Sequence, residues 1–224
     1  MGRRLQRIFI ASAAIAALTG CATLPDARPW GGDATLTPGW ERVRTSAVEA
    51  ALDPWVWGPL LGAAAFQIDD WDRRTADWAR EQTPVFGSTR NAARWSDDLR
   101  SAATWAHYAT ILATPGGDDA GGWLLAKARG SLVHAAAVSA TSNLTSALKD
   151  TTGRERPNGT DDLSFPSGHT SSAAVHAQLA SRNLGSIGLE PGTRRALDAG
   201  LAALTIGTSW ARIEAGYHFP SDTL

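Results

Sequence analysis

The chain has 224 residues, of which 21 are lysine or arginine and 22 are aspartate or glutamate, so its formal net charge is −1. A chain so close to neutral offers no broad basic surface to a nucleic acid backbone, and nucleic acid is not an expected partner. Its only cysteine excludes an intramolecular disulfide. The length suffices for one domain with a sizeable core.

The N-terminus has the features of a secretory signal peptide. Arg3, Arg4 and Arg7 precede an eleven-residue, largely apolar run over residues 8–18, which ends at small residues. A transmembrane anchor is the alternative, but a helix that crosses a bilayer needs roughly 20 apolar residues. We therefore expect residues 1–20 to be removed as a signal peptide.

The single cysteine, Cys21, directly follows this leader. Residues 18–21 resemble the lipobox of bacterial lipoproteins, in which the cysteine is lipid-modified and becomes the first residue after cleavage. An unmodified thiol is the alternative, which the position after a signal-like segment disfavours. Loss of the three leader arginines changes the net charge from −1 to −4. By the sorting logic of such lipoproteins, Ala22 implies an anchor in the outer membrane, facing the periplasm.

Residues 21–39 are expected to be a lipidated tether, because the stretch after Pro25 is rich in proline, glycine and aspartate and lacks periodicity. From residue 40 onward, apolar residues recur at helical spacing and no stretch alternates with the period of a strand. Proline and glycine separate the periodic stretches. The expected helices cover residues 41–52, 54–66, 70–82, 89–113, 121–149, 169–184 and 193–212.

These stretches predict an all-α fold, a single-domain helical bundle over residues 40–224 with a buried central helix. The segment 199–211 is apolar nearly all round and too short to cross a membrane, so we expect it to be the central helix. The ten tryptophans are expected mainly in the core and in grooves, rather than in a membrane-contact belt. One apolar face of the fifth stretch would place Lys149 at its inner, C-terminal end. That face comprises Leu132, Ala136, Ala140, Leu144 and Ala147.

Three segments in the last third of the chain combine cationic or imidazole groups with proline or glycine. Lys149 at a helix end and Arg156 on the following turn, next to Pro157, can reach the same anion. The second segment, residues 166–169, places a hydroxyl, free backbone N–H groups and an imidazole at a helix N-terminus, where phosphate binds readily.

The third segment contains Arg212, His218 and Asp222. A carboxylate that holds one imidazole nitrogen leaves the other free to attack. Each segment alone is a weak signal, since a cap or a solvated turn has the same composition. Together and in this order they indicate a phosphate site.

The three segments resemble the signature of the type 2 phosphatidic acid phosphatase superfamily, which includes bacterial acid phosphatases, lipid phosphatases and vanadium haloperoxidases. The pattern KxxxxxxRP is met by Lys149, Arg156 and Pro157, and PSGH by residues 166–169. The pattern SRxxxxxHxxxD is met except that Ala211 replaces the serine. The resemblance implies that family's helical fold. Loss of one neutral hydrogen bond at Ala211 costs about 0.5–1.5 kcal/mol, so we expect reduced rather than abolished activity.

Carried over to this chain, the resemblance implies a phosphatase that works through a phosphohistidine. His218 would be the nucleophile, Asp222 would orient it and favour its charged state, and His169 would be the general acid. The phosphoryl oxygens would be held by Lys149, Arg156, Ser167, Gly168 and Arg212. No residues stand at metal-ligand spacing, so no metal or other cofactor is expected, and vanadate is expected to inhibit.

Two other functions stay open. The same pocket could hold vanadate as the cofactor of a haloperoxidase, although those chains are typically much longer. A non-enzymatic envelope lipoprotein is the other class. The expected substrates are phosphorylated small molecules of the periplasm or phosphorylated lipids, which an acyl-anchored domain would meet at the membrane.

The remaining polar residues are expected to play ordinary structural roles. His107 and His134 stand on helices without evident partners. His176, seven residues after His169, could share its helix face, and a supporting or packing role is favoured over a catalytic one. We expect Arg154 to form an exposed pair with Glu155, and contact of Arg154 with the substrate is the alternative. Asp161 and Asp162 are expected on a solvated loop.

The chain stops at Leu224, two residues after the aspartate of the third motif. Members of the superfamily continue there as a further helix. We therefore expect a phosphatase domain that lacks its last helix, with Asp222 loosely held on a frayed terminus.

Overall fold

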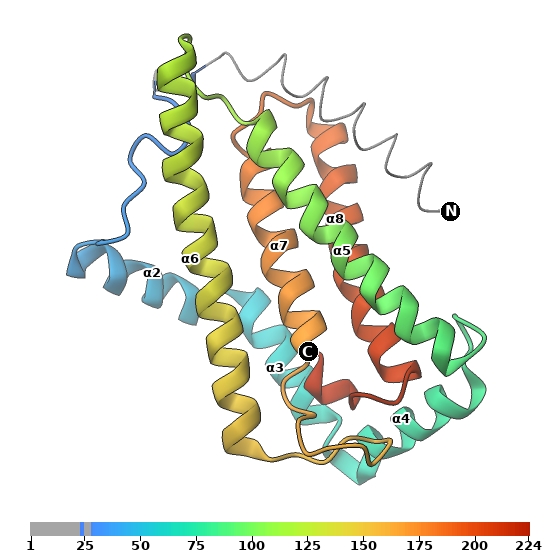
Figure 1. Cartoon of the computed structure of the whole chain (residues 1–224). Coiled ribbons are helices and arrows are strands. Elements are labelled where there is room, and N and C mark those ends of the chain that lie inside the picture. The colour runs from blue at the N-terminus through green and yellow to red at the C-terminus, as the bar shows by residue number, and fades with distance from the viewer. Residues whose placement is uncertain (1–22, 25–27) are drawn as a thin grey trace. The chain divides into compact units, whose positions relative to one another are not determined.

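The computed structural model describes residues 23–24 and 28–224 (Figure 1), so the predicted leader and Cys21 lie outside the described residues. The described part is all-α, with seven α-helices, two short 3-10 helices and no strand. Every predicted helix is present, and its ends differ from the prediction by at most three residues. The α-helices are α2 (Trp40–Leu52), α3 (Pro54–Ala65), α4 (Trp71–Gln82), α5 (Thr89–Ala113), α6 (Ala120–Thr152), α7 (Gly168–Leu184) and α8 (Pro191–Glu214), and the 3-10 helices are η1 (Ile68–Asp70) and η2 (Pro220–Asp222). None of these helices combines the length and apolar character needed to cross a bilayer.

The chain forms two compact units. Unit 1 comprises the described residues up to Leu36, Ser101–Ser139 and Ala174–Leu204. Unit 2 comprises Thr37–Arg100, Ala140–Ala173 and Thr205–Leu224. The boundaries fall inside α5, α6, α7 and α8, so each of these helices contributes residues to both units.

Unit 1 combines a small apolar core with a buried chain of histidines. Its core is formed by Ala177, Ala180, Leu184 and Leu201. His107 is buried between the other two histidines. Its Nδ1 lies 2.9 Å from Nδ1 of His176, and its Nε2 lies 2.8 Å from Nδ1 of His134. Burial, assisted by the two neighbouring imidazoles, lowers the pKa of His107 to about 4.

The structure corrects the prediction that His107 and His134 have no partners, and it gives His176 a packing role beside His107. These three histidines come from three different helices, so their spacing in the sequence gives no sign of the contact.

Part of the predicted tether belongs to unit 1 and packs within it. Trp30 is buried, its backbone N–H donates to the Pro115 carbonyl at 2.7 Å, and its ring lies directly over Gly130, where a Cβ would collide with it. The Lys127 ammonium lies 5.3 Å from the centre of the same ring. A single aromatic side chain therefore buries enough apolar surface to fix a segment that composition predicted to be free.

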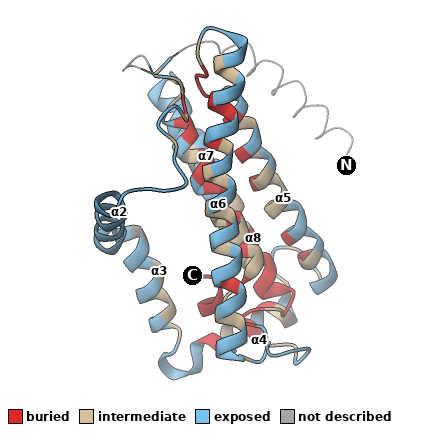
Figure 2. Ribbon diagram, turned by 60° about the vertical axis from the view of Figure 1, so that its left-hand side comes forward, coloured by how far each residue is buried: buried red, intermediate tan, exposed pale blue. Residues whose placement is uncertain are grey.

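No residue of α2 is buried, and Figure 2 shows this helix pale blue throughout. The burial predicted for the tryptophans, for one face of α6 and for the segment 199–211 is wrong. Trp40, Trp57, Trp71 and Trp78 are each at least half exposed, and only Trp30 belongs to the buried set among the described tryptophans. The predicted inner face of α6 is exposed at Leu132 and Leu144, and the predicted central segment 199–211 is exposed at Ile206 and at several small residues. Alanine and glycine carry little apolar surface, so their exposure costs little and an apolar average does not determine burial.

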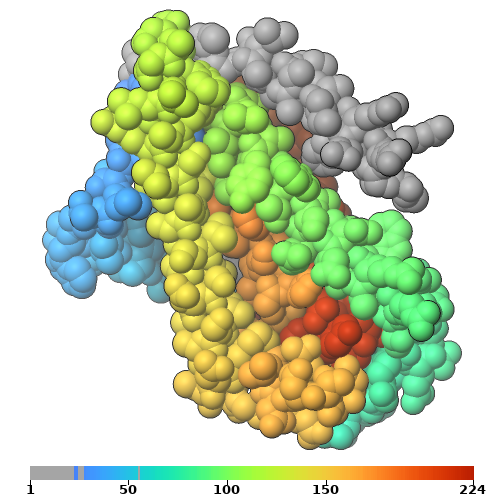
Figure 3. Space-filling view, viewed as in Figure 1, coloured from blue at the N-terminus to red at the C-terminus, as the bar shows by residue number. Residues whose placement is uncertain are grey.

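The buried end of α8 and the residues after it belong to unit 2. Residues 211–223 are buried apart from Tyr217, which is half-buried. Figure 3 shows only a small red area of this segment beside the orange loop 154–167. The completely buried Glu214 accepts hydrogen bonds from the backbone N–H groups of Val85 and Phe86 at 2.9 and 3.0 Å, and from Trp210 Nε1 at 2.5 Å. This carboxylate ties the end of α8 to the turn between α4 and α5.

Candidate active site

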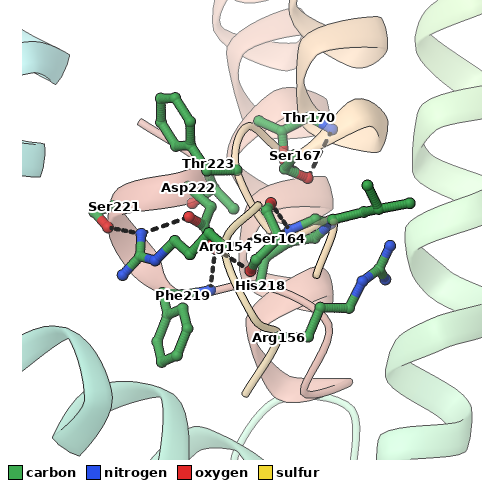
Figure 4. A network of polar contacts seen from close by, with 12 residues as sticks. Arg154, Arg156, Ser164, Ser167, Thr170, His218, Phe219, Ser221, Asp222 and Thr223 are labelled. Atoms are coloured by element: carbon green, nitrogen blue, oxygen red, sulfur yellow. Dashed lines mark hydrogen bonds and ion pairs between the residues drawn. The ribbon is translucent and has the colours of Figure 1, made fainter. Parts of the chain in front are cut away.

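Unit 2 brings residues of all three motifs together at one end of α6, α7 and α8. His218 follows α8 and is 1 % exposed. Its Nδ1 lies 2.6 Å from the Ser164 carbonyl, which can only accept, so Nδ1 carries the proton and Nε2 keeps its lone pair (Figure 4). Burial lowers the pKa of His218 to about 4, because it outweighs the opposing effect of Asp222. Asp222 favours the charged form of the imidazole, as the resemblance implies, but burial has the larger effect and the ring is neutral near pH 7.

Asp222 is firmly held, contrary to the expectation of a frayed terminus. It is 3 % exposed and accepts hydrogen bonds from Ser164 Oγ at 2.5 Å, from the Phe219 N–H at 2.7 Å and from Arg154 Nη1 at 2.6 Å. Burial would raise the pKa of Asp222, but its contacts with His218 and Ser164 and the charge of Arg154 hold it below the usual value.

The contact between Asp222 and His218 is indirect. Asp222 Oδ2 lies 3.8 Å from His218 Nδ1, beyond hydrogen-bond distance, whereas Ser164 binds the aspartate through its hydroxyl and the imidazole through its carbonyl. Ser164 is completely buried. The predicted direct orientation of His218 by Asp222 is thus replaced by a bridge through Ser164, with the carboxylate acting at longer range through its charge.

The motifs contribute three cations to the same unit as His218 and Asp222. Lys149, near the end of α6, donates to the Leu163 carbonyl at 2.5 Å. Arg156 pairs with Asp161 at 2.6 Å, so Asp161 does more than occupy a solvated loop. Arg212 is buried, and its Nε has no acceptor within hydrogen-bond distance among the described residues.

Arg156 lies close enough to Arg212 and Lys149 to lower the pKa of both. Burial and the charge of Arg156 lower the pKa of Arg212 to about 10, and the same two causes lower the pKa of Lys149. Both guanidinium groups lie against the Tyr217 ring, at 4.1 Å for Arg212 and 5.4 Å for Arg156. Such a cluster favours an anion that would neutralise it.

The second motif forms the start of α7. The Ser167 N–H donates to the Asp222 carbonyl at 2.8 Å, and the buried Ser167 hydroxyl accepts from Thr170 Oγ1 at 3.1 Å. Gly168 is the first residue of the helix, and a Cβ on it would lie 3.9 Å from Lys149 Cε. The helix N-terminus therefore faces the same region as the lysine.

His169 is half-buried and contacts α5. Its Nε2 lies 2.8 Å from Asp97 Oδ1. Burial and the charge of Arg212 lower the pKa of His169, while the hydrogen bond with Asp97 opposes this shift. Ala211, where the superfamily has serine, is completely buried in the last turn of α8.

Sequence reasoning missed several residues of this site. Motif spacing revealed neither Ser164 nor Tyr217. Asp97 and Asp72 are far upstream, and nothing in their local sequence distinguishes them from exposed helical aspartates. Arg154 pairs with Asp72 and Asp222, rather than with Glu155 as predicted. Within the described residues, no group of three or more His, Cys, Asp or Glu side chains could hold a metal ion.

A cavity of about 510 Å³ adjoins the site. Its walls include Asp72, Arg154, Arg156 and Phe219, with further carboxylates from η1 and α4. It is not lined by Lys149, His169, Arg212 or His218. The cavity therefore lies beside the residues that hold Asp222, rather than around the imidazoles.

The order and geometry of the three motifs agree with a comparison against protein families. Residues 130–224 match the PAP2 superfamily. This part of the chain is similar to that superfamily, whose members are generally phosphatases and related enzymes. The match contains all three motifs and confirms the resemblance read from them, whereas Asp72 and Asp97 lie outside it. No curated protein and no solved structure matches the chain.

Proposed function

We propose that the chain is a metal-independent phosphatase that hydrolyses phosphate monoesters through a phosphohistidine at His218. The observation that carries the proposal is the state of the His218 ring. Its Nδ1 proton is directed to the Ser164 carbonyl and its pKa is lowered to about 4, so Nε2 is an unprotonated nucleophile in the field of Arg212 and Lys149. A neutral imidazole beside positive charge suits attack on a phosphate dianion.

In the first step, His218 Nε2 forms a bond to phosphorus while the bond from phosphorus to the ester oxygen breaks. The departing oxygen takes a proton from His169, which in its protonated form has one N–H for Asp97 and a second for the leaving group. Phosphorylation places positive charge on the His218 ring, and Asp222 stabilises that charge. Lys149, Arg156 and Arg212 stabilise the charge on the phosphoryl oxygens.

In the second step, His169 accepts a proton from water as the water oxygen attacks phosphorus. The nitrogen–phosphorus bond breaks, which releases inorganic phosphate and returns His218 to its neutral form. Substrates in this proposal are soluble or lipid phosphate monoesters. We also propose that the protein is exported and lipid-anchored at Cys21, where it would meet both classes of substrate.

The test is phosphate release by the purified chain from a panel of soluble and lipid phosphates, with and without a chelator. We expect release that vanadate inhibits and that the chelator does not affect, and we expect none from His218→Ala. The matched control is His134→Ala, which lies outside the motifs. Full activity of His218→Ala, loss of activity on chelation that a divalent metal restores, or halide oxidation with peroxide in place of phosphate release would overturn the proposal.

A further inference from the structure

Asp72 is a buried carboxylate in the first turn of α4, and it binds Ser221, which lies 149 positions later in the chain. It is 5 % exposed. Its Oδ1 accepts from the Ser221 N–H at 2.9 Å, and its Oδ2 accepts from Ser221 Oγ at 2.5 Å and from Arg154 Nη2 at 2.6 Å. A buried carboxylate with this many donors is rigidly placed.

Arg154 joins this carboxylate to the aspartate of the third motif. Its Nη1 donates to Asp222 Oδ1 at 2.6 Å and to Ser221 Oγ at 2.9 Å, and the guanidinium lies 4.4 Å from the centre of the Phe219 ring. In Figure 4 the Arg154 side chain reaches Asp222 from the side opposite Ser164. The planar guanidinium thus binds the carboxylates of Asp72 and Asp222 at once, a geometry that lysine could not reproduce.

Asp72 also decides where Arg154 lies. The side chain of Arg154 is 30 % exposed and borders the cavity described above, whose walls include Asp70 and Asp77. Without the Asp72 charge, Arg154 would keep only one of its two carboxylate partners, and its Nη2 would be free to turn toward the cavity. Its ion pair with Asp222 would then be less firmly held, whereas Asp222 would keep Ser164 and the Phe219 N–H.

We propose that Asp72 is a positioning residue of the phosphatase reaction. Through Arg154 it fixes the place and the charge of Asp222, and through Asp222 and Ser164 it fixes the ring of His218. The inference rests on the proposed function and extends it to a helix outside the matched region of the chain. Its consequence is that residues upstream of the three motifs help to set the reactivity of the nucleophile.

The alternative is that Asp72 only ties the C-terminal segment to α4. Ser221→Ala separates the two roles, because it removes hydroxyl contacts to Asp72 and Arg154 but leaves the chain Asp72–Arg154–Asp222 in place. Asp77→Asn is the matched control, since Asp77 lies on the same helix and the same cavity wall and its side chain is 46 % exposed.

The experiment compares wild type, Asp72→Asn, Asp77→Asn and Ser221→Ala by the pH dependence of phosphate release and by NMR titration of the His218 ring. We expect Asp72→Asn to lower kcat at least about tenfold, as commonly found for a partner behind a reacting group, with KM changed by less than about twofold. With the ion pair between Arg154 and Asp222 weakened, the pKa of His218 should rise, and the fall in rate on the acid side of the pH profile should move to higher pH. In Asp77→Asn and Ser221→Ala, the rate of phosphate release should fall on the acid side at the same pH as in the wild type.

The outcomes separate this inference from the proposed function. An active wild type, with Asp72→Asn equal to Asp77→Asn in kcat and in His218 titration, overturns the inference alone. A folded wild type that releases no phosphate overturns the proposed function, and the positioning of His218 is then decided by the ring titration, which needs no turnover. If Asp72→Asn does not fold, Arg154→Lys carries the test, because it keeps the positive charge but cannot bind both carboxylates. An unchanged kcat and acid limb in that variant would overturn the inference.

Discussion

At the scale of single residues, the two imidazoles of the site differ in the contacts that set their protonation. His218 is almost completely buried, and burial dominates its lowered pKa. His169 is half-buried, and its contact with Asp97 partly offsets the effects of burial and of Arg212. The nucleophile is therefore kept neutral, whereas the general acid gains its proton only in acidic solution.

This difference predicts an acidic optimum for kcat/KM. Protonation of His218 removes the nucleophile, so the rate should fall as the pH drops through about 4. Deprotonation of His169 removes the acid, so the rate should fall again as the pH rises through a pKa below 6.5. The measurement is kcat/KM for an aryl phosphate between about pH 3 and 9. A rate that keeps rising above pH 7 would contradict this assignment of roles.

Asp97→Asn should make the pH profile of kcat/KM narrower, with the change on its alkaline side. The carboxylate favours the protonated form of His169, so its loss should lower the pKa of His169 and move the alkaline limb to lower pH. The shift should stay below about one pH unit, because the Asp97 side chain is 61 % exposed and solvent screens its charge. Asp98→Asn, on the exposed neighbour, is the control. Equal profiles for the two variants would show that Asp97 does not tune His169.

At the scale of secondary-structure elements, sequence periodicity predicted the helices well and their burial poorly. Proline and glycine mark the helix ends independently of tertiary packing, so the bounds of α5 were predicted without error. Burial depends on which elements meet. Ile206 belongs to a segment that is apolar nearly all round, yet it is 67 % exposed. The short-range environment of Asp222 likewise gave no hint that Arg154 and Ser164 hold it.

Glu214 joins α8 to the turn between α4 and α5, and its loss should lower the free energy of unfolding more than that of an exposed residue. Glu214→Ala leaves the N–H groups of Val85 and Phe86 and the Trp210 indole without their acceptor in a buried site. Unsatisfied buried groups cost about 1–3 kcal/mol each, so we expect the free energy of unfolding to fall by at least about 2 kcal/mol. Chemical denaturation measures this loss. Glu155→Ala, at an exposed position, should change the free energy by less than about 0.5 kcal/mol, and an equal effect of both variants would refute the role of Glu214.

At the scale of the whole molecule, three short motifs predicted the chemistry because each has a fixed spacing and a fixed order. Lys149, His169 and His218 were found in this way, and the structure places them within one unit. The contributions of α4 and α5 could not be found, because Asp72 and Asp97 meet the motifs only after folding. The exposure of Trp40 and Trp57 was also unpredictable, since an aromatic residue at helical spacing fits a core and a surface equally well.

The predicted anchor at Cys21 concerns the molecule as a whole. In a bacterial host, Cys21→Ser should abolish acylation, and the protein should move from the membrane fraction to the soluble fraction. Fractionation with a wash at high salt, together with mass spectrometry of the N-terminal peptide, measures both effects. A variant that stays in the membrane fraction after the wash would contradict the lipid anchor.

The most direct test of the central claim is to trap the covalent intermediate. Turnover of a radiolabelled phosphate ester by the wild-type chain, stopped with alkali, should leave label on one peptide that contains His218, and acid should release that label. His218→Ala should carry no label, whereas wild-type protein stopped with acid should retain no stable phosphoserine. Label that survives acid, or label of equal amount in His218→Ala, would contradict a phosphohistidine at His218.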